Sequence, residues 1–190
     1  MGHMIGPRVT LREYRREDFP CIRAWANDTA VTRFLSHIFL PPQTHSMTED
    51  FLERVVSGRN NDYNFVIADR ETLAYIGQVD LFGIHSVNRT AELGVVIGED
   101  GKRGQGIGTE AITLMLEFAF LRANMHRVEL WVNSDNARAI RCYEKCGFQH
   151  EGRRRQAHFA GGTHMDLLLM GALRAEWLAE HEGRLLTQNP

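Results

Sequence analysis

The segment KRGQGIGTEA, residues 102–111, carries glycine at three alternate positions and runs directly into an apolar stretch. Gly104, Gly106 and Gly108 leave one edge of this loop without side chains, so backbone N–H groups stay exposed there. Exposed N–H donors at the start of a helix form an anion-binding site, and a phosphate is the first candidate ligand. The segment therefore predicts a strand–loop–helix unit that holds a phosphate-bearing ligand.

Two common phosphate-binding loops do not fit this segment. A Walker A loop requires Gly-Lys followed by Ser or Thr, and here Gly101-Lys102 is followed by Arg103. A dinucleotide fingerprint requires GxGxxG with an acid about twenty residues later, whereas residues 124–128 read NMHRV. A glycine-rich turn without a function remains as the alternative, so the rest of the chain must decide.

The flanking sequence predicts a single mixed α/β domain. Short β-branched segments with brief polar connections favour a mainly antiparallel sheet, and apolar residues at helical spacing indicate the helices between them. Strands are expected at residues 8–14, 64–69, 73–84, 89–98, 126–133, 148–159 and 164–174. Helices are expected at residues 16–28, at 49–58 behind an N-cap at Thr48, and at 109–122, 136–146 and 174–183.

The domain organisation follows from the ends of these elements. Residues 1–3 have the pattern of a cloning scar before Met4, residues 4–175 form the predicted domain, and residues 176–190 form a charged, helical C-terminal tail. No stretch approaches the ~20 apolar residues of a membrane span, and no signal peptide opens the chain. We therefore expect a cytoplasmic protein without a membrane partner.

Composition excludes several classes of protein. The chain has 22 Lys and Arg against 24 Asp and Glu, and this net charge of −2 gives no support for nucleic-acid binding. Three cysteines are too few for a disulfide framework. Cys142 and Cys146 would share a helix face, but no further Cys or His lies nearby at ligand spacing. No metal site is predicted.

A second motif, NSDNARAIRCYEKCGF at residues 133–148, favours a functional interpretation of the glycine loop. Together the two motifs resemble the GNAT superfamily of acyl-CoA-dependent N-acetyltransferases. Residues 103–108 match the family's [RQ]-x-x-G-x-[GA] pyrophosphate loop, and residues 136–148 match its later helix–strand motif. VTLREYRREDF (9–19) and AELGVVIG (91–98) extend the resemblance over essentially the whole chain. The most similar branch includes bacterial ribosomal-protein N-terminal acetyltransferases and spermidine acetyltransferases.

The resemblance implies a GNAT-like fold with a mainly antiparallel central sheet, flanked by helices and splayed between the family's fourth and fifth strands. It also implies acetyl-CoA as co-substrate and no metal. The residues that it places at coenzyme A are Val95, Val96, Arg103, Gly104, Gln105, Gly106, Gly108, Thr109, Asn136 and Tyr143.

Tyr143 and Glu92 are the candidate catalytic residues. The resemblance puts the Tyr143 hydroxyl near the coenzyme A sulfur, where a packed aromatic is the structural alternative. A thiol has a pKa of ~8.5 and tyrosine ~10, so full proton transfer from Tyr143 to the thiolate is uphill by ~2 kcal/mol. We therefore expect Tyr143 to stabilise the developing charge on the sulfur and to deliver its proton late in the reaction. Glu92 is the candidate base for the attacking amine, with a bound water, an ion pair or an exposed carboxylate as alternatives. A covalent route through Cys142 is disfavoured, because its side chain points about 100° away from Tyr143.

The predicted reaction is acetyl transfer from acetyl-CoA to a primary amine by direct attack in a ternary complex. The acceptor is a small-molecule amine or a peptide N-terminus, and the alternative function is a non-catalytic acyl-CoA-binding sensor. Residues 33–47 contain no carboxylate, which argues against a polyamine acceptor. The apolar residues of this segment either line a pocket or pack in the core: Phe34, Leu35, Ile38, Phe39 and Leu40. The resemblance also allows a homodimer.

Overall fold

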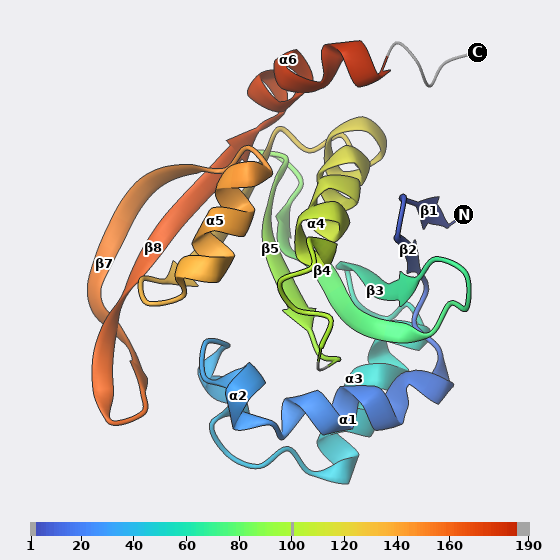
Figure 1. The fold of residues 1–190 in the computed structure, drawn as a ribbon, viewed down its shortest axis with the longest axis vertical. Coiled ribbons are helices and arrows are strands. Elements are labelled where there is room, and N and C mark those ends of the chain that lie inside the picture. Colours follow the sequence, from blue (N-terminus) through green and yellow to red (C-terminus); the bar gives the residue numbers. More distant parts are fainter. Residues whose placement is uncertain (1–2, 100, 186–190) are drawn as a thin grey trace.

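The computed structural model describes residues 3–99 and 101–185, which form one eight-stranded sheet with helices on both faces (Figure 1). Residues 1–2 of the expected cloning scar and residues 186–190 of the expected tail lie outside the described residues. The strands are β1 (Met4–Ile5), β2 (Val9–Arg12), β3 (Tyr63–Asp69), β4 (Tyr75–His85), β5 (Thr90–Ile97), β6 (Arg127–Asn133), β7 (Gln149–Ala160) and β8 (Thr163–Leu173).

The helices occupy the connections between these strands. They are η1 (Arg16–Asp18), α1 (Phe19–Ala26), α2 (Thr29–Thr32), η2 (His37–Phe39), α3 (His45–Val56), α4 (Ile107–Glu117), η3 (Phe118–Arg122), α5 (Ala137–Lys145) and α6 (Arg174–Leu185). None of the helices in the described part of the chain is long and apolar enough to cross a membrane.

The strand order is β1-β2-β3-β4-β5-β6-β8-β7, and β5–β6 is the single parallel pair among the described strands. The parallel register covers only Thr90–Arg127, Ala91–Val128 and Glu92–Glu129. Beyond Glu92 the two strands diverge, although both continue for several residues. The predicted splay is therefore confirmed, and it lies between β5 and β6.

Each face of the sheet has its own apolar core. The α4 helix packs against one face of the sheet, and its residues Ala111, Ile112 and Met115 are fully buried. The other face packs against α1 and α3, where Trp25 and Leu52 belong to a second cluster. In Figure 1, α1–α3 form a group at the bottom of the view, and the β7–β8 hairpin runs along its left side.

Two helix starts differ from the prediction. The predicted N-cap Thr48 is wrong, because Thr44 caps α3 by accepting a hydrogen bond from Met47 N at 3.2 Å. Thr48 instead lies inside the helix, buried, where its hydroxyl donates to the Thr44 carbonyl. The helix expected from Thr109 begins at Ile107, because Gly106 adopts a left-handed conformation with φ +81° and ends the loop.

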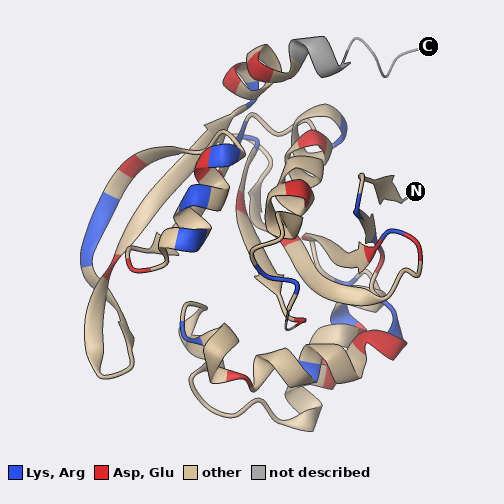
Figure 2. Ribbon diagram, in the orientation of Figure 1, with Lys and Arg blue, Asp and Glu red and all other residues tan. Residues whose placement is uncertain are grey.

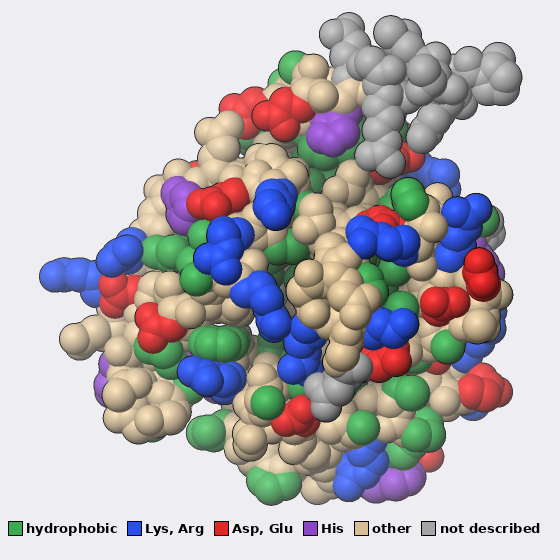
Figure 3. All heavy atoms as spheres, in the orientation of Figure 1, with side chains coloured by type: hydrophobic (Ala, Val, Ile, Leu, Met, Phe, Trp, Pro, Cys, Tyr) green, Lys and Arg blue, Asp and Glu red, His purple; other side chains and the backbone are tan. Residues whose placement is uncertain are grey.

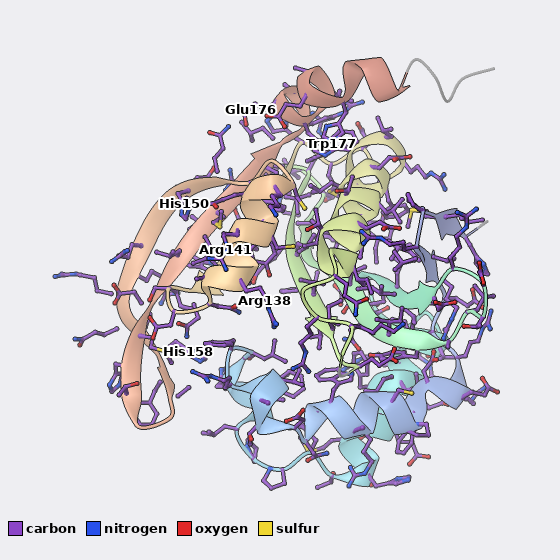
Figure 4. The ribbon with its side chains drawn as sticks, in the orientation of Figure 1. Arg138, Arg141, His150, His158, Glu176 and Trp177 are labelled. Atoms are coloured by element: carbon purple, nitrogen blue, oxygen red, sulfur yellow. The ribbon has the colours of Figure 1, made fainter. Side chains whose placement is uncertain are left out.

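The C-terminal helix packs onto the domain. Trp177 is buried, and its ring centroid lies 5.7 Å from that of Phe120 in η3. Figure 4 shows Trp177 on α6, directed toward the end of the α4–η3 helix. The boundary at residue 175 stays a prediction, and Trp177 beyond it contributes to the main core.

A buried ion pair joins β2 to the start of α1. Arg12 donates two hydrogen bonds to Asp18, at 2.9 and 2.7 Å, and both side chains are buried. Removing one partner leaves a buried charge without compensation, so we expect Asp18→Asn to lower the free energy of unfolding by roughly 3–5 kcal/mol. Urea denaturation measures this as a lower midpoint with an unchanged slope.

The matched control for this prediction is the exposed pair Arg16–Glu53, with an N–O distance of 2.7 Å. Glu53→Gln should leave the unfolding midpoint within experimental error, because exposed ion pairs contribute little. Equal midpoints for Asp18→Asn and Glu53→Gln would contradict the importance of the buried pair.

Two glycines of the loop have different backbone requirements. Gly106 has φ +81°, whereas Gly108 is helical and a Cβ there would meet only Cys142 Sγ at 3.6 Å. Gly106→Ala should destabilise the fold by about 1–2 kcal/mol, since L-residues avoid the left-handed region. Gly108→Ala should be neutral or stabilise by up to ~1 kcal/mol, because alanine favours helix. Thermal unfolding of the two variants checks this, and the reverse order would disprove the assignment.

Candidate active site

A cavity of about 780 Å³ opens where β5 and β6 diverge. Its walls come from β4, β5, the glycine loop, the start of α4, β6, α5, the β7–β8 hairpin and the α1–η2 segment. The predicted site residues that line it are Glu92, Val95, Val96, Arg103, Gly104, Gly106, Gly108, Thr109, Asn136 and Tyr143. Residues from three separate parts of the sequence thus meet in one cavity.

The glycine loop presents backbone donors to this cavity. Gly106 caps α4, and the first N–H groups of a helix have no acceptor within the helix. Arg103 Nε donates to the Ile97 carbonyl at 3.1 Å and ties the loop to the end of β5. Arg8 binds the Gln105 carbonyl from the other side. The loop is therefore held so that the N-terminus of α4, which favours negative charge, borders the cavity.

Gln105 is the predicted cofactor residue that is not among the described residues lining the cavity. Its side chain is exposed and donates to the Gly101 carbonyl at 2.5 Å. This contact stabilises the turn. The motif includes the position but gives no indication of where its side chain points.

Asn136 and Tyr143 reach the cavity from the same helix, α5. The Asn136 side chain caps the helix by accepting from Ala139 N at 3.2 Å. Tyr143 is only 8% exposed and packs edge-on against Phe148, with ring centroids 5.8 Å apart. Burial, reinforced by the neighbouring Cys142 and Cys146, raises the pKa of Tyr143 well above its usual value. The hydroxyl thus stays protonated at neutral pH and remains a hydrogen-bond donor.

Cys142 also lines the cavity, and its Sγ lies 3.3 Å from the Thr109 hydroxyl. A hydrogen bond from the Cys146 thiol lowers the pKa of Cys142, against the opposing effect of burial. The Cys142 side chain lies beside the start of α4, and the positive end of the helix acts on its pKa in the same downward direction.

Glu92 lies on β5 at the last register pair before the splay. Burial raises its pKa, and the carboxylate of Glu129, its partner on β6, raises it further. A carboxylate whose pKa moves toward neutrality is a better proton acceptor at physiological pH. Glu92 and Tyr143 thus line one cavity from two different walls, β5 and α5.

Sequence reasoning missed Asp80, which lines the cavity from β4. Its carboxylate accepts hydrogen bonds from Asn64, Tyr14 and Gln78 at 2.9, 3.2 and 3.2 Å. Burial raises the pKa of Asp80 to about 7, although these hydrogen bonds act in the opposite direction. Alternation along β4 could have placed Asp80 on the same face as Gln78. It could not have predicted the hydrogen-bond partners Asn64 and Tyr14, which come from other segments.

The basic face of α5 was also missed. Arg138, Arg141 and Lys145 line the cavity together with Lys102 and Arg103 of the loop. Figure 2 shows Lys and Arg along α5 and in the β5–α4 loop, and Figure 3 shows their side chains as a band across this face. In Figure 4, Arg138 extends from α5 toward the opening. Arg138, Arg141 and Lys145 are three and four residues apart, and this spacing could have predicted a shared face of the helix.

The α1–η2 segment forms the remaining wall. Four of its five predicted pocket candidates line the cavity, namely Phe34, Leu35, Ile38 and Phe39, whereas Leu40 is exposed outside it. His158 lines the cavity from β7, with Nε2 3.4 Å from the Arg33 carbonyl oxygen. Within the described residues, no group of three or more His, Cys, Asp or Glu side chains could hold a metal ion.

Comparison with known proteins identifies the family. The model for the "Acetyltransferase (GNAT) domain" matches residues 8–149. The spermidine N(1)-acetyltransferase of Vibrio cholerae is 28% identical over 94% of this chain and 100% of its own length. The corresponding Escherichia coli enzyme is 28% identical over 92% of this chain and 90% of its own.

Solved structures agree with these relatives. A crystal structure of spermidine N-acetyltransferase from Vibrio cholerae in complex with CoA and spermine superposes with a TM-score of 0.81 and 27% identity. The match covers 91% of this chain and 99% of that one. These likenesses support acetyl transfer and not a non-catalytic acyl-CoA-binding module. The chain belongs to the GNAT acetyltransferase family and is an acetyl-CoA-dependent N-acetyltransferase.

Proposed function

We propose that this enzyme acetylates a small-molecule primary amine, with Glu92 as proton acceptor and Tyr143 as proton donor. The observation that carries the proposal is that both side chains line the cavity that the glycine loop also borders. Relatives named for spermidine support a small-molecule acceptor. A peptide N-terminus is the alternative acceptor.

The polar groups that line the opening between β5 and β6 can bind the different parts of acetyl-CoA. The loop from Arg103 to Thr109 faces its diphosphate with backbone N–H groups. The edge of β5 at Val95 and Val96 has no pairing with β6 and offers main-chain groups to the pantetheine arm. Asn133 at the end of β6 carries a buried Nδ2 that has no hydrogen-bond partner among the described residues, and a ligand carbonyl would satisfy it.

The acetyl thioester supplies an activated acyl group. A primary amine is protonated at neutral pH, since its pKa is about 10.4. In the proposed reaction Glu92 accepts a proton from the amine, and the neutral nitrogen attacks the thioester carbonyl. The new C–N bond forms as the C–S bond breaks. The Tyr143 hydroxyl donates a hydrogen bond to the sulfur as negative charge develops there and gives it a proton late in the step. The acylated nitrogen loses its second proton as the amide forms, and this proton restores the phenol.

Tyr143→Phe tests the proton donor. The substitution keeps the ring that packs against Phe148 and removes the hydroxyl, so the fold should persist. We expect kcat to fall by about 10²–10⁴-fold while the Kd for acetyl-CoA changes little. Coenzyme A release, followed with a thiol-reactive dye over a panel of primary amines, measures kcat, and calorimetry measures the Kd.

An unchanged kcat in Tyr143→Phe would disprove its role. The same assay separates direct attack from an acyl-cysteine route through Cys142. Direct attack releases no coenzyme A until an amine is added, whereas acylation of Cys142 would give a stoichiometric burst with acetyl-CoA alone.

The basic face of α5 is proposed to bind the phosphate groups of coenzyme A. Arg138→Ala and Arg141→Ala should each weaken acetyl-CoA binding by about three- to tenfold at low salt, and less at high salt. Calorimetric titrations at two salt concentrations measure this. The matched control is Arg54→Ala on the exposed surface of α3, which should leave the Kd unchanged. An equal loss of acetyl-CoA affinity in Arg54→Ala would contradict specific binding by α5 and indicate an effect of the net charge of the protein.

A homodimer, which the resemblance allows, also stays a prediction. Sedimentation equilibrium of the whole chain with and without acetyl-CoA would establish the number of subunits.

A further inference from the structure

We propose that the acceptor carries a single ammonium group on an apolar, preferably aromatic, body, and that Asp80 binds this ammonium group. The inference rests on the proposed function, because it names the class of amine that the same cavity takes. It follows from the position and partners of Asp80 and from the composition of the facing wall.

Asp80 lies beside the splayed part of β5. It is the register partner of Gly94, between the pairs Gln78–Val96 and Phe82–Glu92. Directly opposed residues of an antiparallel pair point to the same face, so these side chains share the face that the cavity uses. The Phe82 ring packs over Gly94, where a Cβ would stand only 3.0 Å from it. Asp80 itself lines the cavity, so a ligand group can reach the carboxylate from the cavity side.

The hydrogen bonds of Asp80 leave room for one more donor. Tyr14 and Asn64 both donate to Oδ1, and Gln78 donates to Oδ2. A carboxylate has about four acceptor positions, so Oδ2 keeps one of them. The three donors come from β3, β4 and the segment after β2, and they fix the carboxylate in place. Asp80 is thus a pre-oriented acceptor for a single further N–H group.

The charge of Asp80 calls for a cation. Burial raises its pKa to about 7, which reflects the cost of an ionised carboxylate away from water. Asp80 takes part in none of the ion pairs found among the described residues. An ammonium group at Oδ2 would supply the opposite charge and favour the ionised form.

The wall that faces Asp80 has no further carboxylate. Asp80 and Glu92 are the two carboxylates among the described residues that line the cavity. The α1–η2 wall is almost entirely apolar, and it consists of Trp25, Ala30, Val31, Phe34, Leu35, Ser36, Ile38 and Phe39. Such a wall stabilises an apolar body by burying it, and an ammonium group placed against it loses its hydration without compensation.

Two aromatic rings of the cavity already face cations. The Arg33 guanidinium lies 4.5 Å from the centroid of the Phe34 ring, and the Arg154 guanidinium lies 5.4 Å from that of Trp131. Each of these rings already has a guanidinium on one face, and the two arginines repel additional positive charge. Apart from Asp80 and Glu92, which is the proposed proton acceptor, the further ammonium groups of a polyamine find no carboxylate among the described residues that line the cavity.

The experiment compares amines of different charge and apolar area with the full-length chain at saturating acetyl-CoA. The probes are 2-phenylethylamine, n-hexylamine, spermidine and a short peptide with a free N-terminus. We expect kcat/KM for 2-phenylethylamine to exceed that for spermidine by at least about tenfold. Equal or better use of spermidine, or of the peptide, would overturn the inference.

Three variants test whether Asp80 and the apolar wall determine the preference among amines. Asp80→Asn keeps the shape and should raise KM for 2-phenylethylamine at least about tenfold, with the Kd for acetyl-CoA unchanged. The matched control is Asp62→Asn, which removes a carboxylate near Asp80 that does not line the cavity, and KM should change by less than about threefold. Ala30→Glu adds a carboxylate to the apolar wall and should shift preference toward spermidine by about threefold or more.

A binding measurement separates this inference from the proposed function. Calorimetric binding of 2-phenylethylamine to the coenzyme A complex needs no turnover. If 2-phenylethylamine binds and Asp80→Asn weakens this binding, the inference is supported. If, in the same experiments, no amine gives coenzyme A release that depends on Tyr143, the proposed chemistry fails although the inference stands. Release that depends on Tyr143, with spermidine preferred, leaves the chemistry standing and overturns the inference. Absence of 2-phenylethylamine binding also overturns it.

Discussion

The divergence of β5 and β6 after three register pairs is the constraint on which this structure depends. Backbone N–H and C=O groups in a protein interior need hydrogen-bond partners, and a strand that leaves its neighbour loses them along that edge. From Gly94 onward β5 keeps β4 on one side and faces the cavity on the other. The α4 helix follows one diverging strand and α5 follows the other, so both helices border the same opening.

The cavity separates opposite charges. Lys and Arg side chains of the loop and α5 border one part, and Asp80 and Glu92 on neighbouring strands border another. This arrangement suits an anionic cosubstrate and a cationic acceptor that must approach each other in one orientation. Burial raises the pKa of both carboxylates and of Tyr143, with different results. The carboxylates become better proton acceptors, whereas the tyrosine is held as a donor.

Local signals were enough for most of the fold. Alternation in the strands and the apolar helix after the loop depend on near neighbours in sequence, and the structure has these elements within a few residues of their expected bounds. The start of α3 was misplaced because Thr44 and Thr48 are both suitable caps. The choice between them depends on the burial of Thr48, which is a property of packing. The glycine motif located the loop, but it gave no indication that the exposed Gln105 side chain donates to the Gly101 carbonyl.

The glycine loop and the helix that carries Asn136 and Tyr143 could be located from the amino-acid sequence alone, because each consists of contiguous residues with fixed spacing. The family resemblance implied the splayed sheet. The groups that lie opposite these elements depend on tertiary packing. Asp80 has its partners Tyr14 and Asn64 in distant segments, and the apolar wall at residues 25–39 lacks a regular period. Strand register and helix packing bring these groups together, and such long-range contacts leave no pattern in a single sequence.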